Sequence, residues 1–515
     1  MAKKYGLFNI QYLGASIYCD EQYKIDALRD FVLGLRKNYF VNKDYITEKN
    51  KEDILLFNTT YYHEARHVHE HLLCPILNYM LRLNVLCSLH AIQFFINWKR
   101  RGNKSINFIP IPLNEWFRLD KEEKLFNQQC WESSLGIKNF HAPEITIPKD
   151  ISLRDIAENI FSKPTNDNDS LNNLLIISAA YYEEYKNFKR IVYDQGRCEY
   201  SIRAIIESSA FVCQMTAISL MFGNIGESYV RNTISDLFES KQFTVYTGLF
   251  TFIFRYLCYT GFDLQYQYPV TSYILFWCLN GNVLSSDSII DPIKRLDLFT
   301  QKDLLHGVKF HQLYNSPLDY FANWDKAIGS TSIDYDLYQK YIINDYDRII
   351  HSIDDFSDGL FSEFSPYIES IKNATVLMIE QFIDNPSKFL MPQLYLENIY
   401  DYANVPVKFI VDNDDFSFNL DEISKQNGIL VQDNVVKNDK IEPKWIAANC
   451  PRFNMFEKYE VLPPTADDIL LTHQINEKAH PYLLLSDSLF SPLSVTSPTD
   501  IIKSIIPDIE VGFIL

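Results

Sequence analysis

A chain of 515 residues is longer than one hydrophobic core usually supports, so two or three domains are expected. Hydrophobic residues make up 47% of the sequence and aromatic residues 15%, a globular composition that excludes a disordered chain. The formal net charge of -18 is spread along the sequence without a basic stripe, so nucleic acid is not expected as a partner.

Cysteine usage and the N-terminal segment bear on the compartment of the protein. Nine cysteines form an odd, widely spaced set with no C-x-x-C pair, which is typical of reduced thiols in the cytoplasm. Asn9 and Gln11 interrupt the apolar residues near the N-terminus, so no signal peptide is expected. The most apolar long stretch, residues 71–98, contains Arg82 and other polar side chains, which favours a buried helix over a membrane span. We therefore expect a cytoplasmic protein.

Most of the predicted elements are helices. Glycine is scarce, with 16 residues, and this scarcity favours a helix-rich architecture. Within residues 103–170, several prolines and the run NDNDS predict a loop-rich insertion. Apolar residues recur at helical spacing over residues 25–40, 61–98 with a kink or boundary at Pro75, 171–193, 199–223, 243–279 and 333–385. Residues 1–385 are therefore predicted to form a mainly helical region.

After about residue 386 the pattern changes. Residues 405–414 and 428–436 contain short apolar runs between clusters of Asn, Asp and Pro, and such runs predict β-strands. Residues 386–515 are therefore expected to form a mixed α+β C-terminal region. The predicted fold class is mainly α with a smaller α+β portion.

Four of the eleven histidines lie within residues 63–71, where the run HEARH is an H-E-x-x-H motif. On a helix, His63 and His67 are four residues apart and project one above the other. Two imidazoles so placed can bind one zinc ion, with Glu64 lying between them in the sequence.

The neighbouring sequence supports a helix at this motif. No proline or glycine interrupts residues 61–74, and Thr59 or Thr60 can serve as the N-cap. At about 100° per residue, apolar side chains such as Val68 and Leu72 fall on the face opposite the motif. We expect this apolar face to anchor the motif helix in the core.

The alternative to a metal site is a solvated helix face, rich in His and Glu, that binds no metal. Histidine is locally abundant, because His69 and His71 follow the motif. We expect these two histidines to lie at the surface or to support the ligands, and not to be ligands themselves.

The motif resembles that of the zincin metallopeptidases. The resemblance implies that His63 and His67 hold zinc and that Glu64 is the general base that activates water. The glycine and third histidine of the metzincin branch are missing after the motif. The resemblance is therefore to the gluzincin branch, whose third ligand is a glutamate on a later helix, and it implies a multi-helix zincin-like core.

Glu207 is the candidate for this third ligand. It lies within the apolar run 199–223, where an ionised carboxylate is costly unless it is paired or binds a metal. The next three residues are small enough for another helix to approach, and E-S-S-A resembles the E-x-x-A pattern around such ligands. The alternative is an ion pair with Arg203, although Arg before Glu is the weaker helical orientation. Further candidates are Glu199, Glu183 and Glu184.

Two observations leave room for other metal sites. The 139 residues between His67 and Glu207 (68–206) exceed the usual gluzincin spacing, which an insertion at 103–170 would explain. A di-iron carboxylate centre could instead use Glu64-x-x-His67 as one half-site. A second half-site occurs as the run EKAH at 477–480, but the proline that follows would end its helix.

The sequence thus predicts a zinc-dependent hydrolase, and within that class a metallopeptidase with a restricted set of protein or peptide substrates. The restriction is expected because an unrestrained protease in the cytoplasm would harm its host. The alternative is a catalytically silent helical interaction protein whose motif is structural or arose by chance.

Overall fold

The protein is described from a computed structural model. The described residues are 6–9, 14–19, 47, 50–101, 107–136, 139–142, 189–193, 196–239, 246–259, 264–281, 292–302, 304–306, 308–354, 364–391, 407–411, 430–432, 436–437, 440–441, 444–448, 499, 502–503 and 507–514. The helix predicted at residues 25–40 lies outside this part of the chain.

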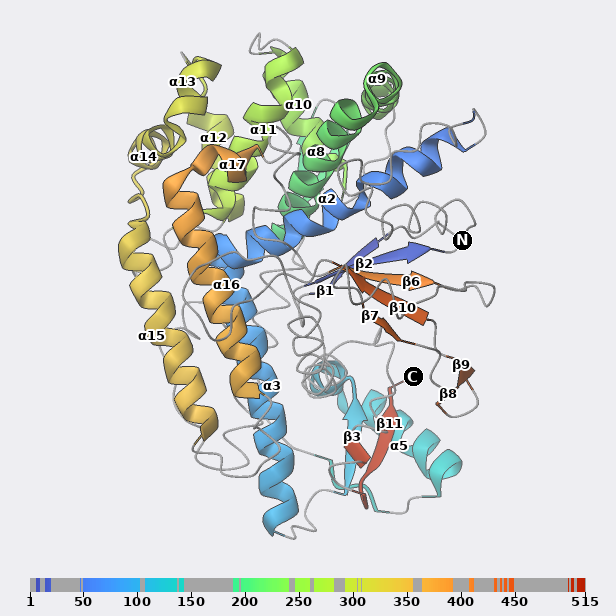
Figure 1. The fold of residues 1–515 in the computed structure, drawn as a ribbon. Helices are drawn as coiled ribbons and strands as arrows, with labels where there is room; N and C mark the ends of the chain where they lie inside the picture. The colour runs from blue at the N-terminus through green and yellow to red at the C-terminus, as the bar shows by residue number, and fades with distance from the viewer. Residues whose placement is uncertain are drawn as a thin grey trace. The chain divides into compact units, whose positions relative to one another are not determined.

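Helices dominate the described residues, with a smaller portion of strands, which confirms the predicted fold class (Figure 1). The helices are α2 (Lys51–Leu73), α3 (Pro75–Arg101), α4 (Leu113–Arg118), α5 (Lys121–Leu135), α8 (Ile202–Phe222), α9 (Asn224–Glu239), α10 (Gly248–Tyr259), α11 (Leu264–Leu279), α12 (Pro292–Lys302), α13 (Phe310–Asn315), α14 (Pro317–Ala327), α15 (Tyr335–Asp354), α16 (Phe364–Asp384) and α17 (Pro386–Leu390). The predicted helices at 199–223, 243–279 and 333–385 correspond to α8, to α10 and α11, and to α15 and α16, except that residues 199–200 belong to strand β5 (Gly196–Tyr200).

The strands form one larger sheet and three pairs. They are β1 (Gly6–Asn9), β2 (Gly14–Cys19), β3 (Phe108–Ile111), β4 (Lys189–Tyr193), β5 (Gly196–Tyr200), β6 (Val407–Val411), β7 (Leu430–Gln432), β8 (Val436–Lys437), β9 (Lys440–Ile441), β10 (Lys444–Ala448) and β11 (Glu510–Phe513). The five-stranded sheet has the order β1-β2-β6-β10-β7, with β2 and β6 parallel and the other neighbours antiparallel. Strands near the N-terminus therefore pair with strands from the C-terminal region.

The chain divides into two compact units. Unit 1 consists of Met1–Asn78, Phe188–Asn344 and Glu369–Gln474, and unit 2 consists of Tyr79–Asn187, Asp345–Ile368 and Ile475–Leu515. Unit 1 contains the five-stranded sheet together with α2 and α8, and unit 2 contains the parallel pair of β3 and β11. Each unit is thus assembled from segments that are distant in the sequence.

The motif helix α2 begins at Lys51, earlier than the predicted start at residue 61. Thr59 and Thr60, the predicted N-caps, lie inside this helix, and their hydroxyls donate hydrogen bonds to backbone carbonyls one turn earlier. The predicted cap was therefore wrong. A threonine hydroxyl bonded back to its own helix is satisfied without ending the helix.

The predicted boundary at Pro75 is confirmed. α2 ends at Leu73, and Cys74 has an extended backbone with φ -72° and ψ 125°. α3 then begins at Pro75, a position where the missing N–H of proline costs no helical hydrogen bond.

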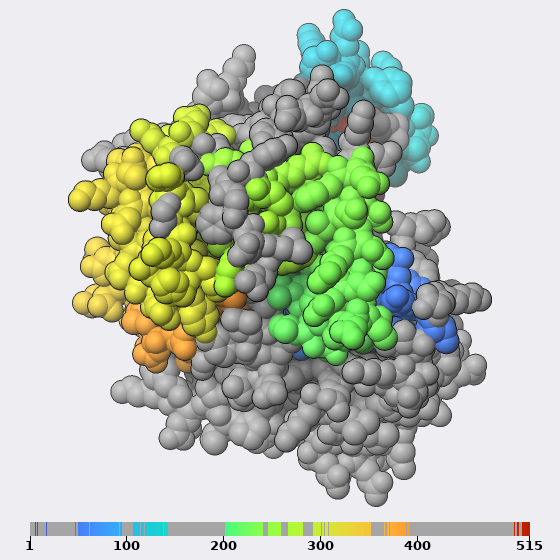
Figure 2. All heavy atoms as spheres, turned by 90° about the horizontal axis from the view of Figure 1, so that it is seen from above, coloured from blue at the N-terminus to red at the C-terminus, as the bar shows by residue number. Residues whose placement is uncertain are grey.

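α8 starts at an N-cap: the Ser201 hydroxyl accepts a hydrogen bond from the backbone N–H of Ala204 at 3.1 Å. The helix packs against α2, α9, α10 and α11. In Figure 2, atoms coloured green to yellow cover much of the face shown. α8 is thus an internal helix of unit 1.

Membrane-spanning potential is limited to a few of the described helices. α8 is long and apolar enough to cross a membrane. α2 and residues 75–91 reach that length and apolar character only when they are taken together as one helix bent at the break between them. Of the apolar window in α8, 67% is buried inside the protein. Core helices of soluble proteins have the same length and composition, so this finding is weak evidence for a span.

Two stretches contain elements that a helical or loop pattern in the sequence does not by itself predict. Residues 189–193, predicted as the end of a helix, form β4 and pair with β5. The prediction was wrong there because β-branched and aromatic residues in KRIVY suit a paired strand. In the region 103–170, the structure describes β3, α4 and α5, and α5 begins with a capping box between Asp120 and Glu123.

Candidate metal centre

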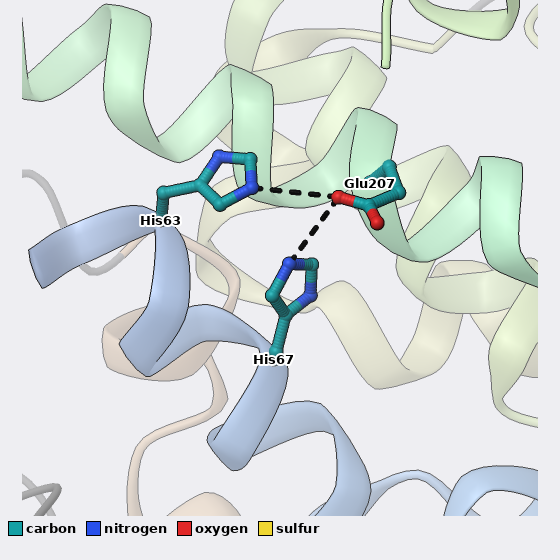
Figure 3. Close-up of side chains that lie close together, drawn as sticks. All are labelled: His63, His67 and Glu207. Carbon is teal, nitrogen blue, oxygen red and sulfur yellow. Dashed lines mark ion pairs between the residues drawn. The ribbon is translucent and has the colours of Figure 1, made fainter. Parts of the chain in front are cut away.

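Three side chains from two helices converge in unit 1. His63 and His67 extend from α2, and Glu207 extends from α8 toward both of them (Figure 3). Oε2 of Glu207 lies 3.4 Å from Nε2 of His63 and 3.4 Å from Nε2 of His67. The structure therefore brings together the three residues that the sequence indicated as metal ligands.

The spacing of these atoms fits a single small cation. The three ligand atoms all lie within 4.8 Å of one another. A tetrahedral ion bonded at about 2.0–2.2 Å holds its ligand atoms roughly 3.3–3.6 Å apart, which matches both distances to Glu207. Two imidazole nitrogens and one carboxylate oxygen are also a donor set that zinc prefers. The residues present thus fit a zinc ion.

The cluster is held largely away from solvent, and its electrostatics couple the three groups. Burial lowers the pKa of His67, but the hydrogen bond to Glu207 and the negative charges around it raise that pKa more. Burial raises the pKa of Glu207, but hydrogen bonds and charge from His63 and His67 lower it well below its usual range. Without a metal, Glu207 is therefore ionised and favours the protonated form of His67.

The ion pair between Glu207 and Arg203, predicted as the alternative to metal binding, is also present at the cluster. Nε of Arg203 lies 3.5 Å from Oε1 of Glu207, while Oε2 faces the histidines. The two oxygens of one carboxylate thus serve an ion pair and the histidine pair at the same time.

Glu64, the expected general base, lies next to the cluster and is 6% exposed. The backbone of Gly6 in β1 comes so close that a Cβ there would lie 2.6 Å from Oε1 of Glu64. β1 is an edge strand of the five-stranded sheet. A strand edge therefore limits where the Glu64 carboxylate can move.

Of the two places expected for His69 and His71, the surface is wrong, because both side chains are buried. His69 is 3% exposed and lies against the ring of Phe389, and His71 is 1% exposed. Nδ1 of His71 lies 2.6 Å from the carbonyl oxygen of His67, and burial lowers the pKa of His71 to about 3. Packing of α2 on α8 and on β1 and β2 removes these side chains from solvent, and a helical repeat alone does not predict such packing.

A buried polar network ties the two site helices together one turn below the cluster. The Ser209 hydroxyl on α8 donates to Oε1 of Glu70 at 2.5 Å, and Arg66 donates to the same oxygen at 3.0 Å. Arg66 also stacks on the ring of Phe389 at 4.6 Å. Because Glu70 is fully buried, burial raises its pKa, and its bonded partners stabilise the charged form.

Among the described residues, the two histidine rings are contacted by other aromatic rings. Within the described part of the chain, Nδ1 of His63 and Nδ1 of His67 are buried without a hydrogen-bond partner. The ring of Phe8 lies 5.6 Å from that of His67, centroid to centroid, and the two histidine rings meet edge to face at 4.9 Å.

Tyr246 is a site residue that sequence reasoning missed. Its ring centroid lies 6.3 Å from that of His63, and its side chain is hydrogen-bonded to Arg203. Burial and the negative charges of Glu207 and Glu64 raise the pKa of Tyr246. No sequence signal distinguishes it among the 33 tyrosines, since only folding brings it to the cluster.

The other candidate ligands do not enlarge the cluster within the described residues. The one group of metal-binding side chains found there is His63, His67 and Glu207. Glu199 lies on β5. Glu183, Glu184 and the di-iron half-site at 477–480 lie outside the described residues.

Comparison of the chain with protein-family models, with curated proteins and with solved structures finds no match. Any functional conclusion therefore depends on the geometry and chemistry of the cluster itself.

Proposed function

We propose that the protein is a zinc-dependent hydrolase that cleaves peptide bonds in a restricted set of protein or peptide substrates. One observation carries the proposal: His63, His67 and Glu207 converge from two helices with their ligand atoms within 4.8 Å. Catalytic zinc sites commonly use three protein ligands and keep a fourth position open, whereas structural sites use four. The donor set of two histidines and one glutamate therefore supports a catalytic site.

Glu64 supplies the proton transfer in this proposal. When bound, a zinc ion supplies a Lewis acid that polarises the scissile carbonyl and acidifies a water molecule. The Glu64 carboxylate accepts a proton from this water and returns it to the leaving amine. Its burial beside Gly6 supports the role, because a carboxylate in a confined place holds one orientation.

Tyr246 supplies a hydrogen-bond donor for the negative charge that develops on the carbonyl oxygen. Its raised pKa keeps the phenol protonated at neutral pH, as a donor must be. Its ring is 43% exposed and lies beside that of His63, so it is open to a substrate that approaches the cluster.

A second candidate function is a non-catalytic helical interaction protein. The observation that favours it is the pairing of Glu207 with both histidines and with Arg203, which gives the buried carboxylate polar partners without a metal. In that case the H-E-x-x-H motif joins α2 to α8 and has no part in chemistry.

Metal content and one substitution separate these functions. Purified protein is expected to bind about one equivalent of zinc. A content of less than about a tenth of an equivalent of zinc, iron or manganese would contradict the proposed enzyme. Glu64→Gln should keep the metal but lose about 10²- to 10⁴-fold in kcat on a cleaved protein or peptide. Equal activity of the wild type and Glu64→Gln would favour the interaction protein. Broad cleavage of casein would contradict the proposed restriction to a small set of protein or peptide substrates.

A further inference from the structure

The metal centre is not the only polar contact between α2 and α8. At the centre, Oε2 of Glu207 lies 3.4 Å from Nε2 of His63 and 3.4 Å from Nε2 of His67. Elsewhere between the same helices, the Ser209 hydroxyl donates to Oε1 of Glu70 at 2.5 Å. Glu70 follows His67 by three residues on α2, and Ser209 follows Glu207 by two residues on α8. This second contact therefore lies close to the metal centre on both helices.

The second contact has three buried members, because Arg66 takes part in it. Arg66, Glu70 and Ser209 are 2%, 0% and 1% exposed. Nε of Arg66 lies 3.0 Å from Oε1 of Glu70 and 3.1 Å from Oγ of Ser209, so its N–H is shared between the two oxygens. The Ser209 hydroxyl gives its single proton to the carboxylate and accepts from Arg66 on a lone pair. The three side chains thus form one connected anchor between the helices.

The anchor restrains α8 more tightly than Glu207 does. The carboxylate of Glu207 is at the end of a long, rotatable side chain, so α8 could shift while this carboxylate stays near the histidines. The hydroxyl of Ser209 is on a short side chain, and its hydrogen bond holds the backbone of α8 close to Glu70. Arg66 extends the restraint to the end of α17, because its Nη1 donates to the carbonyl oxygen of Phe389 at 2.5 Å.

Stability alone does not explain a buried ion pair at this place. Moving an arginine and a carboxylate out of water is costly, and well-packed apolar side chains of similar volume often stabilise a core as well or better. The best-attested use of such buried polar groups is to fix one register between helices against the alternatives. The register that Arg66, Glu70 and Ser209 fix is the one that brings Glu207 to the two histidines.

We propose that Arg66, Glu70 and Ser209 are positioning residues that hold Glu207 beside the two histidines before a metal ion binds. A ligand that is already in place has less freedom to lose, so the anchor raises the affinity of the cluster for zinc. The anchor acts through Glu207, which shares α8 with Ser209. This inference rests on the proposed zinc site and adds the residues that set its geometry.

The zinc affinity of the metal-free, full-length protein tests the proposal without requiring catalysis. Ser209→Ala removes the hydroxyl that joins α8 to the anchor. It should weaken zinc binding by about 10- to 100-fold, the usual loss for a residue that orients a metal ligand. Competition with a chromophoric chelator measures the affinity. Ser209→Thr keeps the hydroxyl and should bind zinc within about threefold of the wild type.

Thr271→Val is the matched control for a general loss of stability. Thr271 is fully buried on α11 in the same unit, and its hydroxyl donates to the carbonyl oxygen of Gln267 at 2.6 Å. The variant loses one buried hydroxyl with little change of shape and leaves the anchor side chains in place. Its zinc affinity should stay within about twofold of the wild type. An equal loss of zinc affinity in Thr271→Val and Ser209→Ala overturns the positioning role.

A double-mutant cycle with Glu207→Ala shows whether Ser209 acts through this ligand. The variant Glu207→Ala keeps both histidines, and its zinc affinity is the reference for the cycle. Adding Ser209→Ala to it should change the affinity by less than about twofold, because the ligand that the anchor places is gone. A loss as large as in the wild-type background overturns the proposal, since Ser209 would then act independently of Glu207.

Failure of this inference is distinguishable from failure of the proposed hydrolase. Zinc affinity of Ser209→Ala within about twofold of the wild type overturns the positioning role and leaves the metal centre standing. A wild-type protein that binds no zinc overturns the proposed hydrolase, and this inference with it.

Discussion

The carboxylate of Glu64 lies directly against the backbone of Gly6. A Cβ on Gly6 would lie 2.6 Å from Oε1 of Glu64 and 2.5 Å from Cγ2 of Thr60, closer than real Cβ contacts allow. Gly6 begins the edge strand β1, whereas Glu64 lies within α2. The missing side chain at Gly6 therefore makes room for the expected general base.

Gly6→Ala should displace Glu64 and reduce kcat by about 10- to 100-fold, because a shift of about 1 Å misplaces a catalytic group. Zinc binding should stay at the wild-type level, since Glu64 is not one of the three proposed ligands. Kinetics on a cleaved peptide and metal analysis of the same preparation check both parts. Thr60→Ser in the Gly6→Ala background removes the nearest methyl group and should restore part of the activity. An unchanged kcat in Gly6→Ala would contradict the prediction.

Tyr246→Phe removes the proposed hydrogen-bond donor and leaves the ring. The expected result is a fall in kcat of about 10²- to 10³-fold, the usual loss for one oxyanion donor, with KM and zinc content near those of the wild type. Steady-state kinetics with metal analysis measure the effect. Tyr229→Phe on α9 is the control, because the pKa of Tyr229 is also raised, to about 12, by burial and by Glu52, which is not part of the cluster. A loss expressed only in KM would assign Tyr246 to binding.

Ser209→Ala tests the polar link between the two site helices. The substitution removes a hydrogen bond to the buried Glu70 carboxylate, so the free energy of unfolding should fall by about 1–3 kcal/mol. Ser208→Ala is a matched control from the adjacent position. The Ser208 hydroxyl is buried without a hydrogen-bond partner within the described part of the chain, so its loss should cost less than about 1 kcal/mol. Urea unfolding of the metal-free variants compares the two, and equal losses would exclude a special role for the link.

The raised pKa of His67 predicts how pH affects zinc binding. In the metal-free protein, protonated His67 stabilises the fold. This contribution is complete below about pH 6.5, the unfolded value, and is lost as pH rises through the higher folded pKa. Zinc requires neutral His67, so at lower pH its binding must displace a proton. Because the proton competes with zinc less at higher pH, zinc stabilises the protein more as pH rises.

The rise in Tm on addition of zinc should therefore be larger at about pH 8.5 than at about pH 6. Thermal melts with and without zinc at the two pH values measure this difference. Glu207→Gln, which removes one of the three proposed ligands, should show a smaller zinc effect at both values. A zinc effect that is equal or larger at the lower pH would contradict the assignment of His67 as a ligand.

Local sequence was sufficient for the parts of the site that lie within one helix. The spacing of His63 and His67 places both imidazoles on one side of α2, because four residues make about one helical turn. The apolar run around Glu207 predicted α8, and the cost of an ionised carboxylate there indicated a partner. Both inferences rely on regularities that repeat every few residues along the chain.

Contacts between distant segments were decided only by the tertiary structure. The burial of His69 and His71, the contact of Gly6 with Glu64 and the approach of Tyr246 to His63 depend on which elements pack together. The parallel pairing of β2 with β6 likewise joins residues about four hundred positions apart. Helical periodicity shows which faces are apolar but not what covers them, so the sequence determined the helices and the candidate ligands, and packing decided their surroundings.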